Sequence, residues 1–223
     1  MKQVADKILQ YHRTLDPLGV ELVAVSKFHP AEMIRSAYDA GQRIFGESRV
    51  QELLAKIPLL PSDIKWHFIG HLQTNKVRQI IGKTSLIESV DSERLLNLID
   101  SESLRAGVVT RVLLQIHVAQ EETKSGFSPE EFIDFFTNRR FENLKATHIC
   151  GVMGMASNTD DTDRVAADFN AIATLRLRAL EAAPDLRGFD TVSMGMSGDF
   201  PLAIKNGATL VRIGTDIFGE REY

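Results

Sequence analysis

A small set of side chains in this 223-residue chain could carry chemistry. One is the primary amine of Lys27, which directly follows an apolar run and Ser26. The others lie late in the chain and combine hydroxyls, glycines and one arginine: Ser193, Ser197, Arg212, Gly214 and Thr215. A partly neutral lysine amine can attack a carbonyl carbon, while hydroxyls and backbone N–H groups can hold a phosphate. These residue types therefore indicate a site for a compound that carries both a carbonyl and a phosphate.

Each of these groups follows a segment with the pattern of a buried strand. Residues 22–25 form an unbroken apolar run, which is typical of a strand buried on both faces, and Pro30 then opens a helical pattern. The same succession recurs along the chain, after a first helical segment at about residues 3–15, and it includes a helix predicted at residues 75–81. The predicted strands are residues 22–25, 43–46, 64–69, 85–90, 108–118, 146–153, 191–193 and 210–213.

Eight strands that alternate with helices predict an α/β fold, a single (β/α)8 TIM-type barrel over residues 1–223 with an extra N-terminal helix. The rival is an open doubly wound sheet, which normally has a glycine-rich loop after its first strand. Residues 26–30 contain no glycine, which favours the barrel. Barrels commonly bind phosphate between the loops after strands seven and eight. We therefore expect Lys27 and the late hydroxyl and glycine groups to face one opening.

Two chemistries fit an amine opposite a phosphate site. One is a Schiff-base aldolase that acts on a sugar phosphate, and the other is a lysine that holds pyridoxal phosphate as an internal aldimine. Arg212 would need partners inside the core, so we expect it to point into the barrel mouth. If it faced a pyridine nitrogen, its charge would disfavour protonation there and weaken the ring as an electron sink.

Six motifs, spread in order along the chain, closely resemble those of the pyridoxal phosphate homeostasis proteins. They are residues 24–27 (AVSK), 45–52 (FGESRVQE), 66–76 (WHFIGHLQTNK), 124–126 (KSG), 193–197 (SMGMS) and 211–215 (VRIGT). The resemblance implies a barrel similar to the N-terminal domain of alanine racemase, a fold type III pyridoxal phosphate protein. It also implies pyridoxal 5′-phosphate bound as an aldimine on Lys27, and a role in vitamin B6 and amino-acid homeostasis without catalytic turnover.

Carried over by position, the resemblance implies that Ser193, Ser197, Gly214 and Thr215 hold the phosphate. Arg212 would face the cofactor, at either its ring nitrogen or its phosphate side.

Two positions depart from the family pattern, in which many relatives have asparagine at position 48 and alanine at position 216. Serine at position 48, in place of asparagine, calls into question a contact between this side chain and the cofactor ring. Asp216 brings a negative charge toward the phosphate loop, which is unfavourable unless the carboxylate points away or pairs with Arg221.

Enzymatic alternatives remain open at this point. An amino-acid racemase needs a second base, a tyrosine from a second domain, and this chain ends at Tyr223. A Schiff-base aldolase usually has its lysine in a later strand with carboxylates nearby, and Glu47 and Glu88 are the only strand-end acids. We therefore expect a cofactor-binding protein rather than an enzyme, with no catalytic residues.

The composition limits partners and location. The net charge of −4 and the scattered basic residues argue against nucleic-acid binding. With one cysteine, Cys150, and no Cys/His cluster, we expect neither a disulfide nor a metal site. No segment approaches membrane-spanning length and the N-terminus lacks an apolar signal region. We expect a cytoplasmic monomer, with apo forms of pyridoxal phosphate enzymes as candidate recipients.

Overall fold

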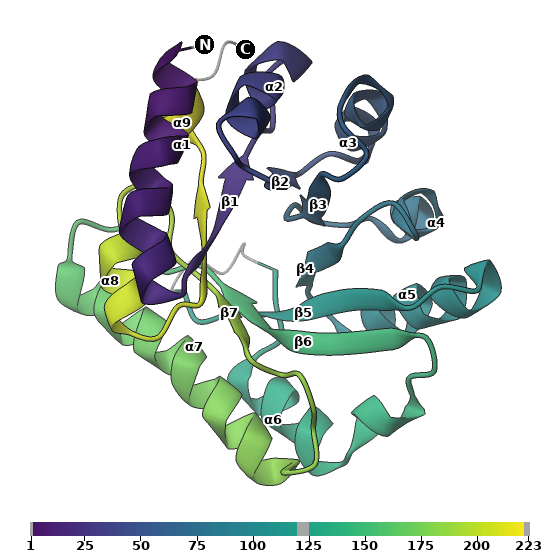
Figure 1. Cartoon of the computed structure of the whole chain (residues 1–223). Coiled ribbons are helices and arrows are strands. Elements are labelled where there is room, and N and C mark those ends of the chain that lie inside the picture. The colour runs from purple at the N-terminus through teal and green to yellow at the C-terminus, as the bar shows by residue number, and fades with distance from the viewer. Residues whose placement is uncertain (1, 120–124, 221–223) are drawn as a thin grey trace.

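Eight parallel strands close into a barrel in which each strand pairs with the next along the chain and β8 pairs with β1 (Figure 1). The computed structural model describes residues 2–119 and 125–220. The strands are β1 Glu21–Val25, β2 Ile44–Glu47, β3 Lys65–Phe68, β4 Leu86–Val90, β5 Thr110–Ile116, β6 Thr147–Gly154, β7 Thr191–Ser193 and β8 Leu210–Ile213. The predicted barrel and its extra N-terminal helix are thus confirmed.

Helices surround the barrel and connect consecutive strands (Figure 1). The α-helices are α1 Lys2–Leu15, α2 Ala31–Asp39, α3 Val50–Lys56, α4 Val77–Ile80, α5 Glu93–Ala106, α6 Pro129–Thr137, α7 Thr162–Ala182, α8 Phe200–Lys205 and α9 Thr215–Phe218. Short 3-10 turns lie at Asp16–Leu18, Ile57–Leu59, Thr74–Lys76 and Arg140–Asn143. Sequence signals set several helix starts: Ser128 and Glu131 form a capping box at α6, and Ser92 caps α5.

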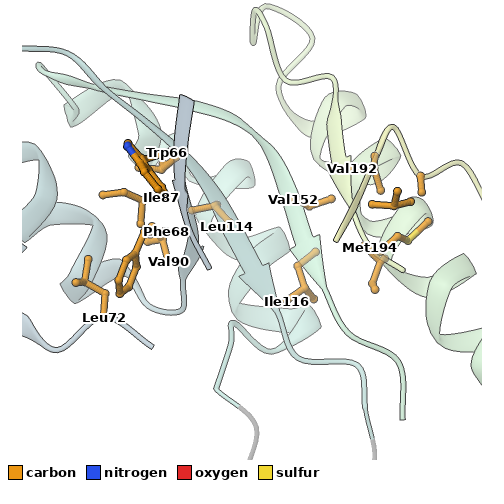
Figure 2. Close-up of a cluster of buried hydrophobic side chains, with 14 of the residues drawn as sticks. Trp66, Phe68, Leu72, Ile87, Val90, Leu114, Ile116, Val152, Val192 and Met194 are labelled. Carbon is orange, nitrogen blue, oxygen red and sulfur yellow. The ribbon is translucent and has the colours of Figure 1, made fainter. Parts of the chain in front are cut away.

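Alternation of side chains along each strand divides the apolar residues into two layers. On β1, Leu22 and Ala24 belong to the large cluster between strands and helices, whereas Val23 and Val25 face the barrel interior with Leu210. Figure 2 shows part of the outer layer, where Trp66, Phe68 and their neighbours project from the strands. Burial on both faces explains the unbroken apolar run that residues 22–25 present.

The barrel interior is apolar in part and polar in part. A second small cluster of Leu86, Leu113, Cys150 and Met153 fills one side, and Cys150 is fully buried there. Between the apolar groups lie buried polar side chains on β3, β4, β7 and β8. A barrel core is normally filled by bulky aliphatic side chains, so these buried polar residues depart from the usual composition of a barrel interior.

Two predicted elements differ from the structure. The strand predicted at 108–118 is shorter, because Thr110 makes the first pairing bond to Ala146 and, beyond Ile116, the chain bonds instead to Phe127. The helix predicted at 75–81 is a 3-10 turn followed by the single turn α4. Across the described residues, every helix is too short or too polar to traverse a lipid bilayer.

Candidate functional site

A cavity of about 250 Å³ opens at the carboxyl ends of the strands. Five of the six predicted site residues line it: Lys27, Ser197, Arg212, Gly214 and Thr215. The remaining lining residues are Val25, His29, Ile69, Met155, Met196 and Gly198. The amine and the late hydroxyl and glycine segments therefore meet across one opening, as the barrel topology requires. Met196, Gly198 and Thr215 are also exposed, so the cavity is open to solvent.

Lys27 lies in a tight turn between β1 and α2. Its side chain is half-buried, while Ser26 before it is fully buried. The backbone N–H of His29 donates to the carbonyl of Ser26, and Phe28 has φ = 69°, a left-handed conformation. The His29 ring stacks on Phe218 at 5.2 Å between centroids, which joins this turn to α9. The turn is thus fixed on the face that carries Thr215.

The two late loops bring backbone close to the cavity. A Cβ atom added at Gly214 would lie 3.2 Å from the Cβ of Val25, which is tighter than ordinary packing. At Gly195, φ is +92° and an added Cβ would lie 2.6 Å from that of Ala203, so glycine is required by both conformation and space. Backbone N–H groups and the hydroxyls of Ser197 and Thr215 are the kinds of donor that can hold an anion with few full charges.

Arg212 is buried and held by fixed partners. Its Nη1 donates to the Ser193 hydroxyl at 2.5 Å and its Nη2 to the Gly154 carbonyl at 2.9 Å, while Nη1 lies 3.9 Å from Glu88 Oε2. The guanidinium also lines the cavity. Arg212 therefore lies beside the cavity and also has hydrogen-bonding partners in the barrel interior.

Ser193 differs from its predicted place at the phosphate. It is not among the residues that line the cavity, and its hydroxyl donates to Glu88 Oε2 at 2.6 Å and accepts from Arg212. The hydroxyl has a single hydrogen, which is already donated to Glu88. Ser193 is therefore best described as a link between Arg212 and Glu88.

His67, within the 66–76 motif, is linked to Glu88 by a contact that the local sequence pattern did not predict. The Nδ1 of His67 lies 2.6 Å from Glu88 Oε1, and both side chains are buried. Burial alone would raise the pKa of Glu88, but hydrogen bonds from His67 and Ser193 and the charge of Arg212 hold it below its usual value. Glu88 is thus held by hydrogen-bonding partners on two sides inside the barrel. Polar residues at interior positions of apolar strands were the available signal.

Asp216 was predicted to oppose the phosphate loop unless it pointed away or paired with Arg221. Arg221 lies outside the described residues. The carboxylate instead accepts from Lys7 Nζ at 2.9 Å and from the Tyr11 hydroxyl at 2.8 Å, both on α1. These bonds lower the pKa of Asp216. The charge is therefore taken up by the N-terminal helix, which fastens α9 from outside the barrel.

Ser48 and His71, two other motif residues, make contacts outside the cavity lining. Ser48 packs its backbone against Gly70, where an added Cβ would lie 2.2 Å from the Ser48 carbonyl oxygen. His71 is exposed and its Nδ1 lies 3.0 Å from Asp91. Lys124, part of the 124–126 motif, lies outside the described residues. No group of three metal-ligating side chains occurs within residues 2–119 and 125–220.

A larger hollow of about 760 Å³ lies on the outside of the molecule, between α1, α2 and the Ile57–Leu59 turn. Its lining is mostly apolar and helical, and it lies away from the strand ends. The smaller cavity brings together an amine, a fixed cation and a donor-lined backbone cradle, so the chemistry assigns the site there. Its volume falls below the roughly 300–1,000 Å³ of pockets for drug-sized ligands, which suits one small phosphorylated ring.

The family model described as "Alanine racemase, N-terminal domain" matches residues 1–222. A protein of Aquifex aeolicus named "Pyridoxal phosphate homeostasis protein" is 40% identical over 209 residues, which is 91% of this chain and 88% of that protein. A protein of the same name from Schizosaccharomyces pombe is 38% identical over 217 residues, 95% of this chain and 89% of that one.

This chain is also similar in structure to proteins that have been solved. PipY of Synechococcus elongatus without PLP has a TM-score of 0.91 and 37% identity, covering 97% of this chain and 100% of that one. The same protein with PLP bound has a TM-score of 0.89 and 36% identity, over 97% of this chain and all of that one. An alanine racemase from Streptomyces lavendulae, at 16% identity and a TM-score of 0.78, shares the fold over 98% of this chain and 57% of its own.

Proposed function

The chain belongs to the pyridoxal phosphate homeostasis protein family, and we propose that it binds pyridoxal 5′-phosphate in the cavity at the strand ends and helps to balance this cofactor in the cell. The observation that carries the proposal is the meeting of Lys27 with the Ser197 and Gly214–Thr215 segments around one small cavity. PipY, 36% identical, has been solved with PLP bound, which supports the choice of ligand.

Lys27 holds the cofactor covalently as an aldimine in this proposal. The neutral amine adds to the aldehyde carbon, and loss of one water molecule leaves a C=N bond; hydrolysis reverses the step and releases the aldehyde. Val25 and Ile69 line the cavity beside Lys27, and such an apolar wall favours the neutral amine. Because the cavity is open to solvent, water can reach the bond and the cofactor can leave.

The phosphate is held by Ser197, Gly214 and Thr215. Ser197 and Thr215 supply hydroxyls, and Gly214, which packs closely on Val25, lines the cavity beside them. Ser193 contributes indirectly, since its hydroxyl bonds Arg212 and Glu88.

Arg212 faces the bound cofactor as a fixed cation. Burial lowers its pKa, while Glu88 and Asp199 oppose the shift, and the guanidinium stays charged. A permanent cation beside the ring nitrogen would disfavour a proton there and leave a poor electron sink; beside the phosphate it would add to binding. The first position would favour a cofactor that is held rather than used, and the second would strengthen its binding.

We propose a carrier without turnover. The curated relatives are named for homeostasis and not for a reaction. Among the described tyrosines, Tyr11 bonds Asp216 and Tyr38 bonds Asp63, both on the outside of the barrel; Tyr223 lies outside the described residues. In the proposed role the protein acts as a cytoplasmic monomer that delivers the cofactor to apo enzymes.

The test is an absorbance spectrum of the protein mixed with pyridoxal phosphate, compared with that of Lys27→Ala. We expect an imine band in the wild type that is absent from the variant. The matched control is Lys145→Met, an exposed lysine far from the cavity, which should keep the band. A wild-type spectrum identical to that of the free cofactor would contradict covalent binding.

A further inference from the structure

Lys56, the last residue of α3, is a buried lysine beneath the turn that carries Lys27. Its side chain is only 8% exposed. Its ammonium donates to the Ser26 carbonyl at 2.8 Å, to Glu47 Oε1 at 2.7 Å and to Glu52 Oε1 at 2.6 Å. An ammonium has three hydrogens, so all of its donors are used. This cluster is separate from the lining of the cavity.

The same cluster holds the backbone on both sides of Lys27. On one side, Ser26 is bound twice, because its carbonyl accepts from Lys56 and its hydroxyl donates to Glu47 at 2.6 Å. On the other side, the backbone N–H of Phe28 donates to Glu52 Oε1 at 2.5 Å. The residues directly before and after Lys27 are thus tied to one ammonium and its two carboxylates.

Phe28 has an unfavourable backbone conformation that these hydrogen bonds hold in place. Its φ of 69° is a left-handed conformation that a residue with a bulky side chain rarely adopts. Such conformations persist when surrounding contacts over-determine them, and they cluster at functional sites. Here the bond to Glu52 fixes the N–H, and the Arg49 guanidinium lies over the ring at 4.7 Å from its centroid.

A purely stabilising ion cluster is the plainer explanation for Lys56. Buried ion pairs, however, contribute little net stability compared with apolar packing, and their best-attested use is to select one geometry. The bonds of this cluster converge on two consecutive turn positions rather than spreading over the helix–strand contact. That convergence favours a geometric role.

We propose that Lys56, with Glu47 and Glu52, is a positioning residue that sets the direction of the Lys27 amine and therefore the rate at which it bonds to an aldehyde. This inference rests on the proposed function of Lys27. Lys56 does not touch the cofactor and acts through the turn.

The test compares Lys56→Met and Glu52→Gln with the Lys145→Met control. Glu52→Gln keeps side-chain size but replaces the carboxylate that accepts from both Lys56 and the Phe28 N–H by a neutral amide, a weaker acceptor, so it serves if Lys56→Met does not fold. The first readout is hydrogen exchange at the Phe28 amide in protein without cofactor. The second is the stopped-flow rate of the imine band after mixing with pyridoxal phosphate.

We expect faster exchange at Phe28 in both variants and imine formation slowed by about tenfold to a hundredfold, since a misplacement of about 1 Å can cost ~100-fold. Lys145→Met should match the wild type in both readouts. A folded Glu52→Gln protein with unchanged exchange and an unchanged rate would overturn the positioning role alone. A wild type that forms no imine band would instead contradict the proposed function of Lys27.

Discussion

Two buried glutamates on either side of β3 behave in opposite ways. Glu47 on β2 and Glu88 on β4 are both 0% exposed, and each lies near a cation. Burial raises the pKa of Glu47 despite Lys56 and Ser26, whereas the partners of Glu88 overcome burial and lower its pKa.

The difference follows from how many carboxylate oxygens are satisfied. Both oxygens of Glu88 are hydrogen-bonded, one by His67 and one by Ser193. Glu47 receives its bonds on Oε1, while Oε2 has no partner among the described residues, and it shares Lys56 with Glu52. Burial is therefore offset only where donors replace water at each oxygen. The Glu88 cluster fixes a cation at the cavity, and the Glu47 cluster fixes backbone beside it.

The largest effect is expected when the Glu88 cluster loses its cation. Arg212→Met leaves a buried carboxylate without its positive partner, and we expect a loss of about 3–5 kcal/mol in the free energy of unfolding. Urea denaturation measures it. Arg105→Met, which breaks the exposed pair with Glu102, should change stability by no more than about 0.5 kcal/mol. Equal small losses in both variants would contradict the account.

Gly214→Ala tests how tightly the phosphate-side backbone packs on β1. Since the new Cβ would lie 3.2 Å from the Cβ of Val25, we expect about 1–3 kcal/mol of destabilisation. Thermal unfolding of Gly198→Ala provides the control, because an added Cβ there meets nothing within 4 Å. If both substitutions lower the midpoint alike, close packing at Gly214 is not the cause.

Asp216→Ala removes the fastening of α9 to α1. The Lys7–Asp216 pair is 31% and 40% exposed, so solvent screens it, and the bond from Tyr11 is the main loss. We expect about 0.5–1.5 kcal/mol of destabilisation, measured by denaturant unfolding. Tyr11→Phe should reproduce most of this loss. A wild-type-like Tyr11→Phe would assign the effect to Lys7 instead.

The pH dependence of stability should separate the two glutamates. A lowered folded-state pKa gives stability that is present above the ordinary value of 4.5 and is lost as pH falls through the folded pKa, so Glu88→Gln should flatten the acid side of the curve. A raised pKa gives the reverse, with stability lost as pH rises from 4.5 through the folded pKa, and Glu47→Gln should remove that loss. Parallel slopes in the two variants would show that the clusters do not differ.

The sequence predicted the barrel because apolar runs buried on both faces leave a strong local pattern. Five of the six predicted groups line one opening, since parallel strands in a closed barrel bring all their carboxyl ends to one face, whereas Ser193 does not line it. The ends of strands were less predictable. Val109 is β-branched, as strand residues often are, but it is 69% exposed because the pairing of β5 begins only at Thr110.

Partnerships over long distances in the chain lay beyond the local pattern. A lysine at the end of a helix, such as Lys56, ordinarily serves the helix dipole in solvent. Its burial depends on Ser26, which lies 30 positions away. Asp216 likewise accepts a hydrogen bond from Lys7, which lies 209 positions away in the chain. Such contacts follow from the closed fold rather than from neighbouring residues.

The most direct test of the central claim is to mix the protein with pyridoxal phosphate, reduce it with borohydride and map the adduct by peptide mass. Reduction turns the C=N bond into a stable amine, so the label records which lysine held the cofactor. We expect a phosphopyridoxyl mass on the peptide that contains Lys27 and none on that peptide in Lys27→Ala. An unlabelled Lys27 peptide, or a label spread over exposed lysines alone, would contradict it.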